Sequence, residues 1–504
     1  MKRVVKTLIP YHRHPDPRLQ TYWDGFQVAL LVIPFSSLLG SVAISLISLI
    51  LFQQLFRRIA RRPVNRGFAI VAVLMVLSAA LAYQKADAFL GLANFLPFFI
   101  IFAALGELIQ TPAQLRRLAW ILVITSVPVV VIGFGQKFGG WAGHVQLLGS
   151  IVDWQIDPTG NPPGRMASIF FYANVLASYL GVTFILSLGL WIEAVIGRQR
   201  AAGGRQKATK GVRCQVSGDR RNTEDGGENP FPTPHSPLPT PYSPIQNSKF
   251  KILFPLLLRS IFLTIALLGN AIALILTDSR NVWAISVLAM FAFAVYLGWR
   301  WLVAGVMTIA GAVLGAAFAP SPVREWLRAI VPAFFWVRLT DQLYPDRPVA
   351  TLRTTQWKFA ASLVQQHPWT GWGLRNFSVL YQEQMHLFIG HPHNLPLMLA
   401  AETGLPATLL FIGLVGWVVF KGSQLLHSWT TVPVSPDLPV PASQFPDRLI
   451  FFTYLTAFLG CALFNLLDIT LFDVRINLIG WLLLAAICGM VYHPSSRVER
   501  NSEF

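Results

Sequence analysis

The 504-residue chain contains 54% hydrophobic and only 12% charged residues, and its mean hydropathy is +0.53. This composition excludes an ordinary soluble enzyme and indicates a membrane protein. The formal charge of +17 does not point to nucleic acid, because the Lys and Arg residues lie mostly in short segments between apolar stretches, as membrane orientation requires.

Apolar stretches long enough to cross a bilayer recur along the chain. A hydrocarbon core of about 30 Å needs about 20 helical residues. Suitable stretches lie at residues 67–83, 88–105, 118–134, 167–195, 254–277, 281–298, 302–319, 403–420, 448–466 and 477–492. The stretch Phe26–Phe56 is longer and has Arg residues at both ends, so two short helices that break near Pro34–Gly40 would keep both ends on one side. We therefore expect an all-α polytopic membrane protein with about 12 transmembrane helices and both termini in the cytoplasm.

The predicted spans divide the chain into six sections. These are N-terminal transmembrane helices (1–197), a basic and Pro-rich cytoplasmic insertion (198–251), central transmembrane helices (252–319), a large periplasmic loop (320–393), C-terminal transmembrane helices (394–492) and a cytoplasmic tail (493–504). The insertion has no apolar periodicity and contains the near-repeats PTPHSP and PTPYSP, so we expect it to be disordered. A loop as long as 320–393 can translocate whatever its charge, so its Arg residues need another explanation.

Ionisable residues at the outer membrane face are the natural functional candidates, because charge is costly within a membrane. Arg165 precedes Asn174 by nine residues, near the start of a span. Ser279 and Arg280 belong to a polar group between two spans. Taken alone, each group is equally explained by side chains that anchor a helix at the interface.

Two further groups lie in the large loop. Arg353 precedes Trp357 by four residues, in a stretch whose apolar residues recur at helical spacing. This pattern predicts an amphipathic helix on the outer surface, and a belt of Trp and Arg at the interface would produce it too. Gly371-Trp372-Gly373 precedes Arg375 and predicts a tight turn or a close approach of the backbone.

The segment His391-Pro392-His393-Asn394 comes shortly before a span. A metal site is not expected there, because Pro392 separates the two imidazoles and no Cys or second His pair is nearby. His393 at the mouth of a span suits a general base, since an unperturbed imidazole titrates near neutral pH. Which of the two imidazoles faces the site is left open.

The order of these groups resembles the O-antigen ligase and polymerase family. The matching pieces are Arg165 with Asn174, Ser279-Arg280 heading a span, Arg353 with Trp357, the turn GWGLRNF, and His393-Asn394 followed by ETGL. The resemblance is closest from about Leu276 to Leu414. It implies a GT-C-like membrane fold and a metal-independent, inverting glycosyltransferase without a cofactor. Such an enzyme takes a glycan from an undecaprenyl-diphosphate carrier at the periplasmic face of the inner membrane and attaches it to an acceptor.

The resemblance also implies roles for individual residues. The catalytic residues would be His393, which takes a proton from the acceptor hydroxyl, and Arg280 and Arg353, which bind the diphosphate. Guanidinium suits this task because it stays charged and bonds two oxygens at once, and the sequence offers no DxD carboxylate pair to hold a divalent ion instead. The residues expected to bind substrate are Arg165, Asn174, Trp357, Arg375, His391 and Asn394.

The sequence leaves the acceptor open among a lipid A-core, the enzyme's own glycan repeat unit and a protein. The expected partners are the undecaprenyl-diphosphate-linked glycan donor, one of these acceptors and membrane lipids, with no nucleic acid. The alternative function is a membrane transporter, related to the members of the same superfamily associated with bicarbonate uptake, and a structural scaffold is a third. A transporter should carry ionisable residues near the bilayer midplane. Here they gather at the outer face, which favours glycan transfer.

Overall fold

The computed structural model describes residues 13–147, 152–218, 245–340, 348–429 and 444–493. These residues are mostly helical, which confirms the predicted fold class. The elements in chain order are η1 (Pro17–Leu19), α2 (Gln20–Val32), α3 (Ser37–Gln54), α4 (Phe56–Arg61), α5 (Pro63–Ala80), α6 (Lys85–Gly91), η2 (Leu92–Asn94), α7 (Leu96–Leu108), α8 (Pro112–Phe138), β1 (Gly143–Leu147), β2 (Val152–Ile156), η3 (Ser168–Phe170), α9 (Ala173–Gly218), α10 (Ile245–Leu276), α11 (Arg280–Leu297), α12 (Arg300–Phe318), α13 (Val323–Ile330), α14 (Ala333–Leu339), η4 (Val349–Thr351), α15 (Arg353–Gln366), α16 (Asn376–Met385), α17 (Leu395–Ser428), α18 (Gln444–Leu467) and α19 (Val474–Tyr492).

Eleven helices of the described chain are long and apolar enough to cross a membrane. They include all ten stretches identified in the sequence, and the eleventh is α3. The shorter α2 precedes α3, and the chain breaks between them at residues 33–36, close to the predicted position. Ser36 caps α3 by accepting a hydrogen bond from the N–H of Leu39.

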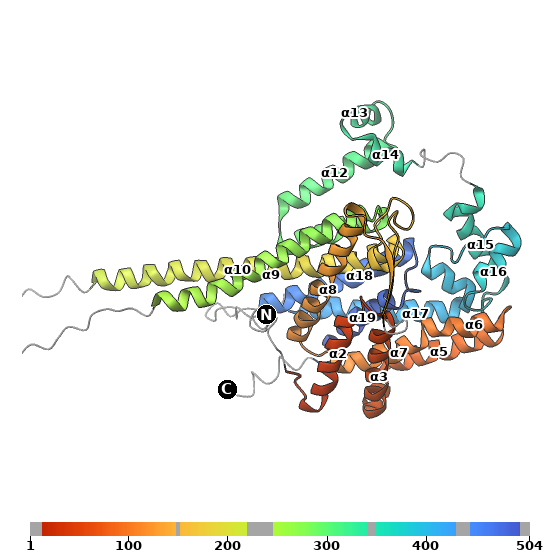
Figure 1. The fold of residues 1–504 in the computed structure, drawn as a ribbon, viewed down its shortest axis with the longest axis horizontal. Coiled ribbons are helices and arrows are strands. Elements are labelled where there is room, and N and C mark those ends of the chain that lie inside the picture. The colour runs from red at the N-terminus through yellow and green to blue at the C-terminus, as the bar shows by residue number, and fades with distance from the viewer. Residues whose placement is uncertain (1–12, 148–151, 219–244, 341–347, 430–443, 494–504) are drawn as a thin grey trace, which may run out of the picture.

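The spans differ in how far they are enclosed by the bundle (Figure 1). α9 and α19 are the most buried, whereas α12 lies at the edge together with α13 and α14. Rings from α5, α7, α17 and α19 pack together at centroid distances of 5.1 to 6.4 Å in the core of the bundle; they belong to Phe68, Phe99, Phe102, Phe411 and Trp481. These contacts hold the elements that lead to the candidate site.

The predicted insertion is partly helical at its ends. α9 continues to Gly218 and α10 begins at Ile245, and the two helices run side by side away from the bundle (Figure 1). Arg, Lys, Gln and Ala are frequent after residue 197, and such residues favour the continuation of a helix that the span has already started. Residues 219–244 lie outside the described residues, and the expectation of disorder for them stays a prediction.

A two-stranded antiparallel hairpin, β1–β2, interrupts the helical pattern between α8 and α9. It rests on the turn between α2 and α3, where Nε1 of Trp154 donates to the carbonyl of Phe35 at 2.6 Å. The sequence analysis did not predict these strands.

The large loop between α12 and α17 contains four short helices, α13 to α16. α15 is the amphipathic helix predicted around Arg353. It buries Phe359, Ala360 and Leu363 and packs against α17. The loop therefore covers the end of the bundle at which α17 begins.

Candidate functional site

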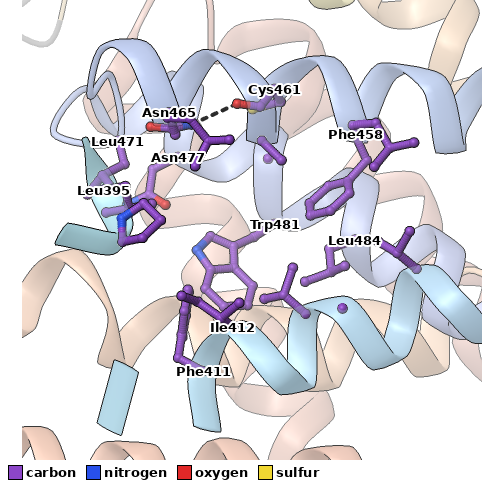
Figure 2. Close-up of a pocket in the computed structure, with 18 of the residues that line it drawn as sticks. Leu395, Phe411, Ile412, Phe458, Cys461, Asn465, Leu471, Asn477, Trp481 and Leu484 are labelled. Atoms are coloured by element: carbon purple, nitrogen blue, oxygen red, sulfur yellow. Dashed lines mark hydrogen bonds between the residues drawn. The ribbon is translucent and has the colours of Figure 1, made fainter. Parts of the chain in front are cut away.

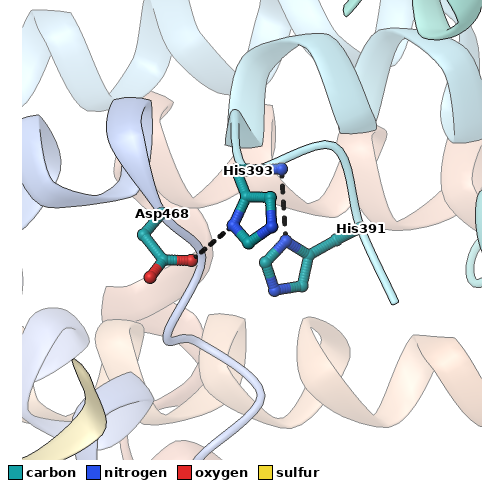
Figure 3. Close-up of side chains that lie close together, drawn as sticks. All are labelled: His391, His393 and Asp468. Carbon is teal, nitrogen blue, oxygen red and sulfur yellow. Dashed lines mark hydrogen bonds and ion pairs between the residues drawn. The ribbon is translucent and has the colours of Figure 1, made fainter. Parts of the chain in front are cut away.

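The turn His391-Pro392-His393-Asn394 leads directly into α17 (Figure 3). Oδ1 of Asn394 accepts a hydrogen bond of 2.9 Å from the N–H of Leu397 and so caps the helix. The backbone of His393 is left-handed (φ 53°), which is uncommon for a residue with a Cβ. Its N–H donates to Nδ1 of His391. The cap and the turn thus fix both imidazoles at the mouth of α17.

The ring of His393 meets a buried carboxylate. Nδ1 of His393 lies 2.8 Å from Oδ1 of Asp468, the residue that follows α18. Asp468 is only 4% exposed. Burial raises the pKa of its carboxyl, but the hydrogen bond from His393 and the two nearby imidazoles outweigh burial and hold this pKa below its ordinary value. The carboxylate therefore accepts the Nδ1 proton, which leaves Nε2 as the acceptor of the neutral ring.

Two polar residues extend this contact. Nδ2 of Asn174, in the first turn of α9, donates to Oδ2 of Asp468 at 2.6 Å. Oδ1 of Asn174 accepts from Nη2 of Arg165 at 2.5 Å, and Nε of Arg165 donates to the carbonyl of Thr277 at 2.7 Å. One chain of hydrogen bonds therefore joins segments that are hundreds of residues apart in the sequence, and it occupies both oxygens of the carboxylate.

His391 has different surroundings from His393. Its ring stacks on Phe472 at a centroid distance of 5.8 Å and meets the His393 ring edge-on at 4.5 Å. Burial, the neighbouring His393 and the charge of Arg353 lower the pKa of His391 to about 4, although Asp468 opposes them. At neutral pH His391 is therefore uncharged, and it is His393 that is hydrogen-bonded to the carboxylate.

The donor atoms of His391, His393 and Asp468 lie within 4.8 Å of one another, so these side chains could hold a metal ion. Two imidazoles and one carboxylate are a donor set that zinc accepts. An ion there would compete with the hydrogen bonds that Asp468 makes to His393 and Asn174. The metal-free site stays a prediction, which transfer in the presence of a chelator would test.

Arg280 is the first residue of α11 and follows a turn in which Asp278 has a φ of 49°. Thr277, at the start of this turn, is the residue whose carbonyl binds Arg165. The side chain of Arg280 is exposed. Within the described part of the chain, its guanidinium takes part in no recorded hydrogen bond or ion pair. The turn before Arg280 is thus tied through Thr277 to the chain of hydrogen bonds, while the charge of Arg280 stays open to a ligand.

Arg353 and Trp357 connect α15 to the histidine turn. Arg353 is the exposed first residue of α15, and its charge acts on His391. Nε1 of Trp357 donates to the carbonyl of Pro392 at 2.9 Å. The sequence pattern that resembled an interfacial belt thus includes a direct contact with the turn that carries His393.

The GWG turn has a structural role. The N–H groups of Trp372 and Gly373 donate to the carbonyls of Ala401 and Glu402, at 2.9 and 2.8 Å. These bonds join the loop to α17 where Gly404 breaks its helical backbone (φ 79°, ψ 163°). A Cβ at Gly404 would clash with the Trp369 carbonyl. We call residues 368–373 and 401–405 the loop–helix joint.

Arg375 lies beside this joint. It has a left-handed backbone (φ 65°) directly before α16. The buried Glu402 accepts a hydrogen bond of 3.2 Å from the N–H of Phe377 and caps α16. No recorded hydrogen bond or ion pair of the described residues connects Arg375 with His391, His393 or Asp468. The structure therefore groups Arg375 with the joint instead of the histidine turn.

An apolar cavity of about 360 Å³ opens between α17, α18 and α19 (Figure 2). Leu395 and Leu471 lie at one end of the cavity, at the left of Figure 2, and are close to Asn394 and Asp468 in the chain. From there it extends past Trp481 to Phe458 and Leu484. The hydrogen-bonded pair His393–Asp468 thus lies next to one end of this apolar cavity.

The sequence analysis missed Asp468 and Tyr172. Tyr172 is partly exposed. Burial and the negative charge of Asp468 raise the pKa of its hydroxyl, and the charge of Arg165 lowers it. Tyr172 therefore lies close to Asp468 and Arg165. Asp468 satisfied the criterion that selected the other candidates, an ionisable residue at the outer end of a span, and that signal could have found it. Nothing in the local pattern distinguished Tyr172.

Residues 263–412 match a family model described as O-antigen ligase. This match confirms the family resemblance over nearly the same residues that carried it in the sequence. No curated protein matches the chain.

Proposed function

Residues 263–412 carry an O-antigen ligase domain, and from this we propose that the protein transfers or polymerises glycan from an undecaprenyl-diphosphate carrier onto an acceptor at the periplasmic face. The reaction inverts the anomeric centre and needs no metal. The observation that carries the proposal is the chain of hydrogen bonds from Arg165 through Asn174 and Asp468 to His393. It holds Nδ1 of His393 against the carboxylate and leaves Nε2 for the acceptor hydroxyl.

His393 acts as the general base. As the acceptor hydroxyl attacks the anomeric carbon, Nε2 takes its proton, and the imidazolium that forms is stabilised by the carboxylate of Asp468. Asp468 keeps the Nδ1 proton in place and is itself held by Asn174. His391, uncharged and packed on Phe472, positions the neighbouring turn.

Arg280 and Arg353 bind the leaving group. When the new bond to the acceptor oxygen forms, the bond between the anomeric carbon and the phosphate oxygen breaks, and undecaprenyl diphosphate departs with the electron pair. Guanidinium groups stabilise this developing charge because they stay protonated and bond two phosphate oxygens at once. Both arginines begin a helix beside the histidine turn or its hydrogen-bonded partners.

The apolar cavity between α17, α18 and α19 fits the polyprenyl chain of the donor. Its lining is hydrocarbon apart from Cys461, Asn465, Asn477 and the indole nitrogen of Trp481. Because Leu395 and Leu471 line the cavity and lie near Asn394 and Asp468 in the chain, a polyprenyl chain in it brings its diphosphate toward the histidine turn.

Transfer in vitro tests the proposal. Purified protein in detergent is given a lipid-linked glycan and acceptor, with and without a chelator, for wild type, His393→Ala, Arg280→Lys and Arg353→Lys. We expect His393→Ala to lose about 100-fold or more. Each Arg→Lys change should cost roughly 1.5 to 3 kcal/mol of transition-state binding, because an ammonium does not replace a bidentate guanidinium.

Matched controls use similar residues elsewhere. His144 pairs with Asp153 in the exposed hairpin, and Arg300 begins α12 as Arg280 begins α11. His144→Ala and Arg300→Lys should transfer at the wild-type rate. Loss of wild-type activity on chelation would identify His391, His393 and Asp468 as metal ligands. Absence of transfer together with bicarbonate uptake into vesicles would favour the transporter instead.

A further inference from the structure

A basic pocket lies at the end of the bundle opposite the histidine turn. Its volume is about 560 Å³, and it is lined by Arg57, Arg58, Arg61, Arg62, Pro63, Tyr492 and His493. α19 begins at Val474, a few residues after Asp468, and ends at Tyr492 in the pocket. Nineteen helical residues span about 28 Å, close to the thickness of a bilayer core. The two sites therefore open at opposite membrane faces.

A buried carboxylate organises two of these arginines. Glu107 of α7 is fully buried, Nε of Arg58 lies 2.8 Å from its Oε2, and Arg62 pairs with its Oε1. Both arginines also contact the ring of His493, Arg62 at 2.7 Å and Arg58 at 2.9 Å. Two of the four guanidinium groups thus have fixed positions.

The other two have no such partner. Arg57 and Arg61 are exposed, and in the described part of the chain their guanidinium groups take part in no recorded hydrogen bond or ion pair. Among the residues that the structure describes, no acidic side chain lines the pocket, so with Glu107 as the counter-charge beneath it the four arginines leave an excess of three positive charges.

Membrane orientation alone does not account for this arrangement. The preference for positive charge in cytoplasmic segments requires arginines on this face, but it does not require a carboxylate buried under them or a concave pocket. Burying Glu107 costs free energy that its pairing with Arg58 and Arg62 offsets. The result is a pre-organised group of donors, and such a group suits a tetrahedral oxyanion.

We propose that this pocket binds a phosphate group, carried by an anionic lipid headgroup or free in solution. Arg57 and Arg61 contact the phosphate oxygens directly, while Glu107 holds Arg58 and Arg62 in place around them. The site is separate from glycan transfer and does not depend on the function proposed above.

Binding to the purified full-length protein in detergent tests the inference. Thermophoresis is measured with short-chain phosphatidylglycerol, with phosphatidylcholine of the same chain length and with sodium phosphate. The double variant Arg57→Gln/Arg61→Gln should bind the anionic probe at least about tenfold more weakly than the wild type, while Glu107 keeps its partners. The matched control is Arg18→Gln/Arg300→Gln, which removes two exposed arginines before α2 and at the start of α12.

The probes distinguish the two sources. Binding of phosphatidylglycerol without binding of phosphate identifies a lipid headgroup, and phosphate binding with no gain from acyl chains identifies a soluble ligand. Absence of saturable binding of either probe would overturn the proposal, as would equal weakening in both double variants, since that indicates attraction by charge alone. If the double variant has a lowered Tm, the single variant Arg61→Gln provides the same comparison.

Discussion

At the scale of single residues, the two histidines of one short turn have different surroundings. His393 is hydrogen-bonded to a buried carboxylate, whereas His391 is packed on an aromatic ring and kept neutral. The difference comes from α18 and the segment after it, not from the turn itself. Substitutions of their partners should therefore separate the two roles.

Asp468→Asn should lower the kcat of transfer about 100-fold or more with little change in KM. An amide preserves the shape of the side chain but cannot stabilise the imidazolium that forms on His393. The measurement is steady-state transfer by purified protein. The control is Asp153→Asn, which alters the exposed His144–Asp153 pair and should leave the kcat and KM of transfer unchanged. A loss confined to KM would show that Asp468 only shapes the binding site.

His391 should make stability depend on pH between about 4 and 6.5. Its pKa in the folded protein is about 4, below the ordinary value of 6.5, so in this window the unfolded chain binds more protons than the folded one. Stability contributed by neutral His391 is thus complete above pH 6.5 and is lost as the pH falls through this window. His391→Phe should flatten this part of the Tm–pH curve, and an unchanged slope would contradict the assignment.

The residues of the site were only partly predictable from the sequence. Arg165, Asn174 and His393 were selected because polar groups next to apolar spans are conspicuous, and the structure links all three. Asp468 joins them across about 300 residues of chain, and no local spacing predicts which carboxylate an imidazole will meet after folding. Arg375 was grouped with the site by its motif, yet the structure assigns its neighbourhood to the loop–helix joint.

At the scale of elements, the helices follow from apolar length and capping, while the connections follow from tertiary contacts. Span lengths predicted ten of the eleven long apolar helices and the break near Pro34 that precedes the eleventh, α3, because the bilayer dictates these lengths. The hairpin β1–β2 was not predicted, since it is short and its Trp154 is held by the turn at Phe35. The joint, too, depends on backbone contacts that no periodicity reveals.

Gly404→Ala should destabilise the protein by roughly 1 to 3 kcal/mol, because it combines a left-handed backbone with a clash against the Trp369 carbonyl. The Tm of purified protein in detergent measures the loss. Gly413→Ala in the same helix is the matched control: a Cβ there meets open space, and the change should be neutral or slightly stabilising. An equal effect of both would mean that the joint does not hold α17 to the loop.

Deletion of residues 203–247 should leave membrane abundance and transfer near wild type. The segment has the composition of a chain that cannot bury a core, and α9 and α10 run away from the bundle toward it (Figure 1). Immunoblotting of membranes and the transfer assay provide the measurements. Loss of folded protein on deletion would reveal a structured domain in the insertion.

At the scale of the whole molecule, the two ends of the bundle carry different chemistry. Asn174 in the first turn of α9 and Thr277 directly after α10 both belong to the chain of hydrogen bonds at the histidine turn. The other ends of α9 and α10 therefore lie toward the opposite face, where the basic pocket also opens. The positive-inside rule assigns that face to the cytoplasm.

A reporter enzyme fused near Ser236 should consequently be active only if it is of a type that works in the cytoplasm. A cysteine in place of Trp369 should react with a membrane-impermeant thiol reagent added outside the inner membrane. Trp369 is 77% exposed and belongs to the loop that covers the histidine turn, so its label reports the side of the candidate site. Labelling is performed in spheroplasts, with Cys214, Cys461 and Cys488 replaced by Ala to remove background. Replacement of the cysteines alone, without Trp369→Cys, gives the blank. External labelling with a cytoplasmic signal at Ser236 places glycan transfer outside and phosphate binding inside, whereas an external signal at Ser236 would invert the molecule and overturn the assignment of both faces.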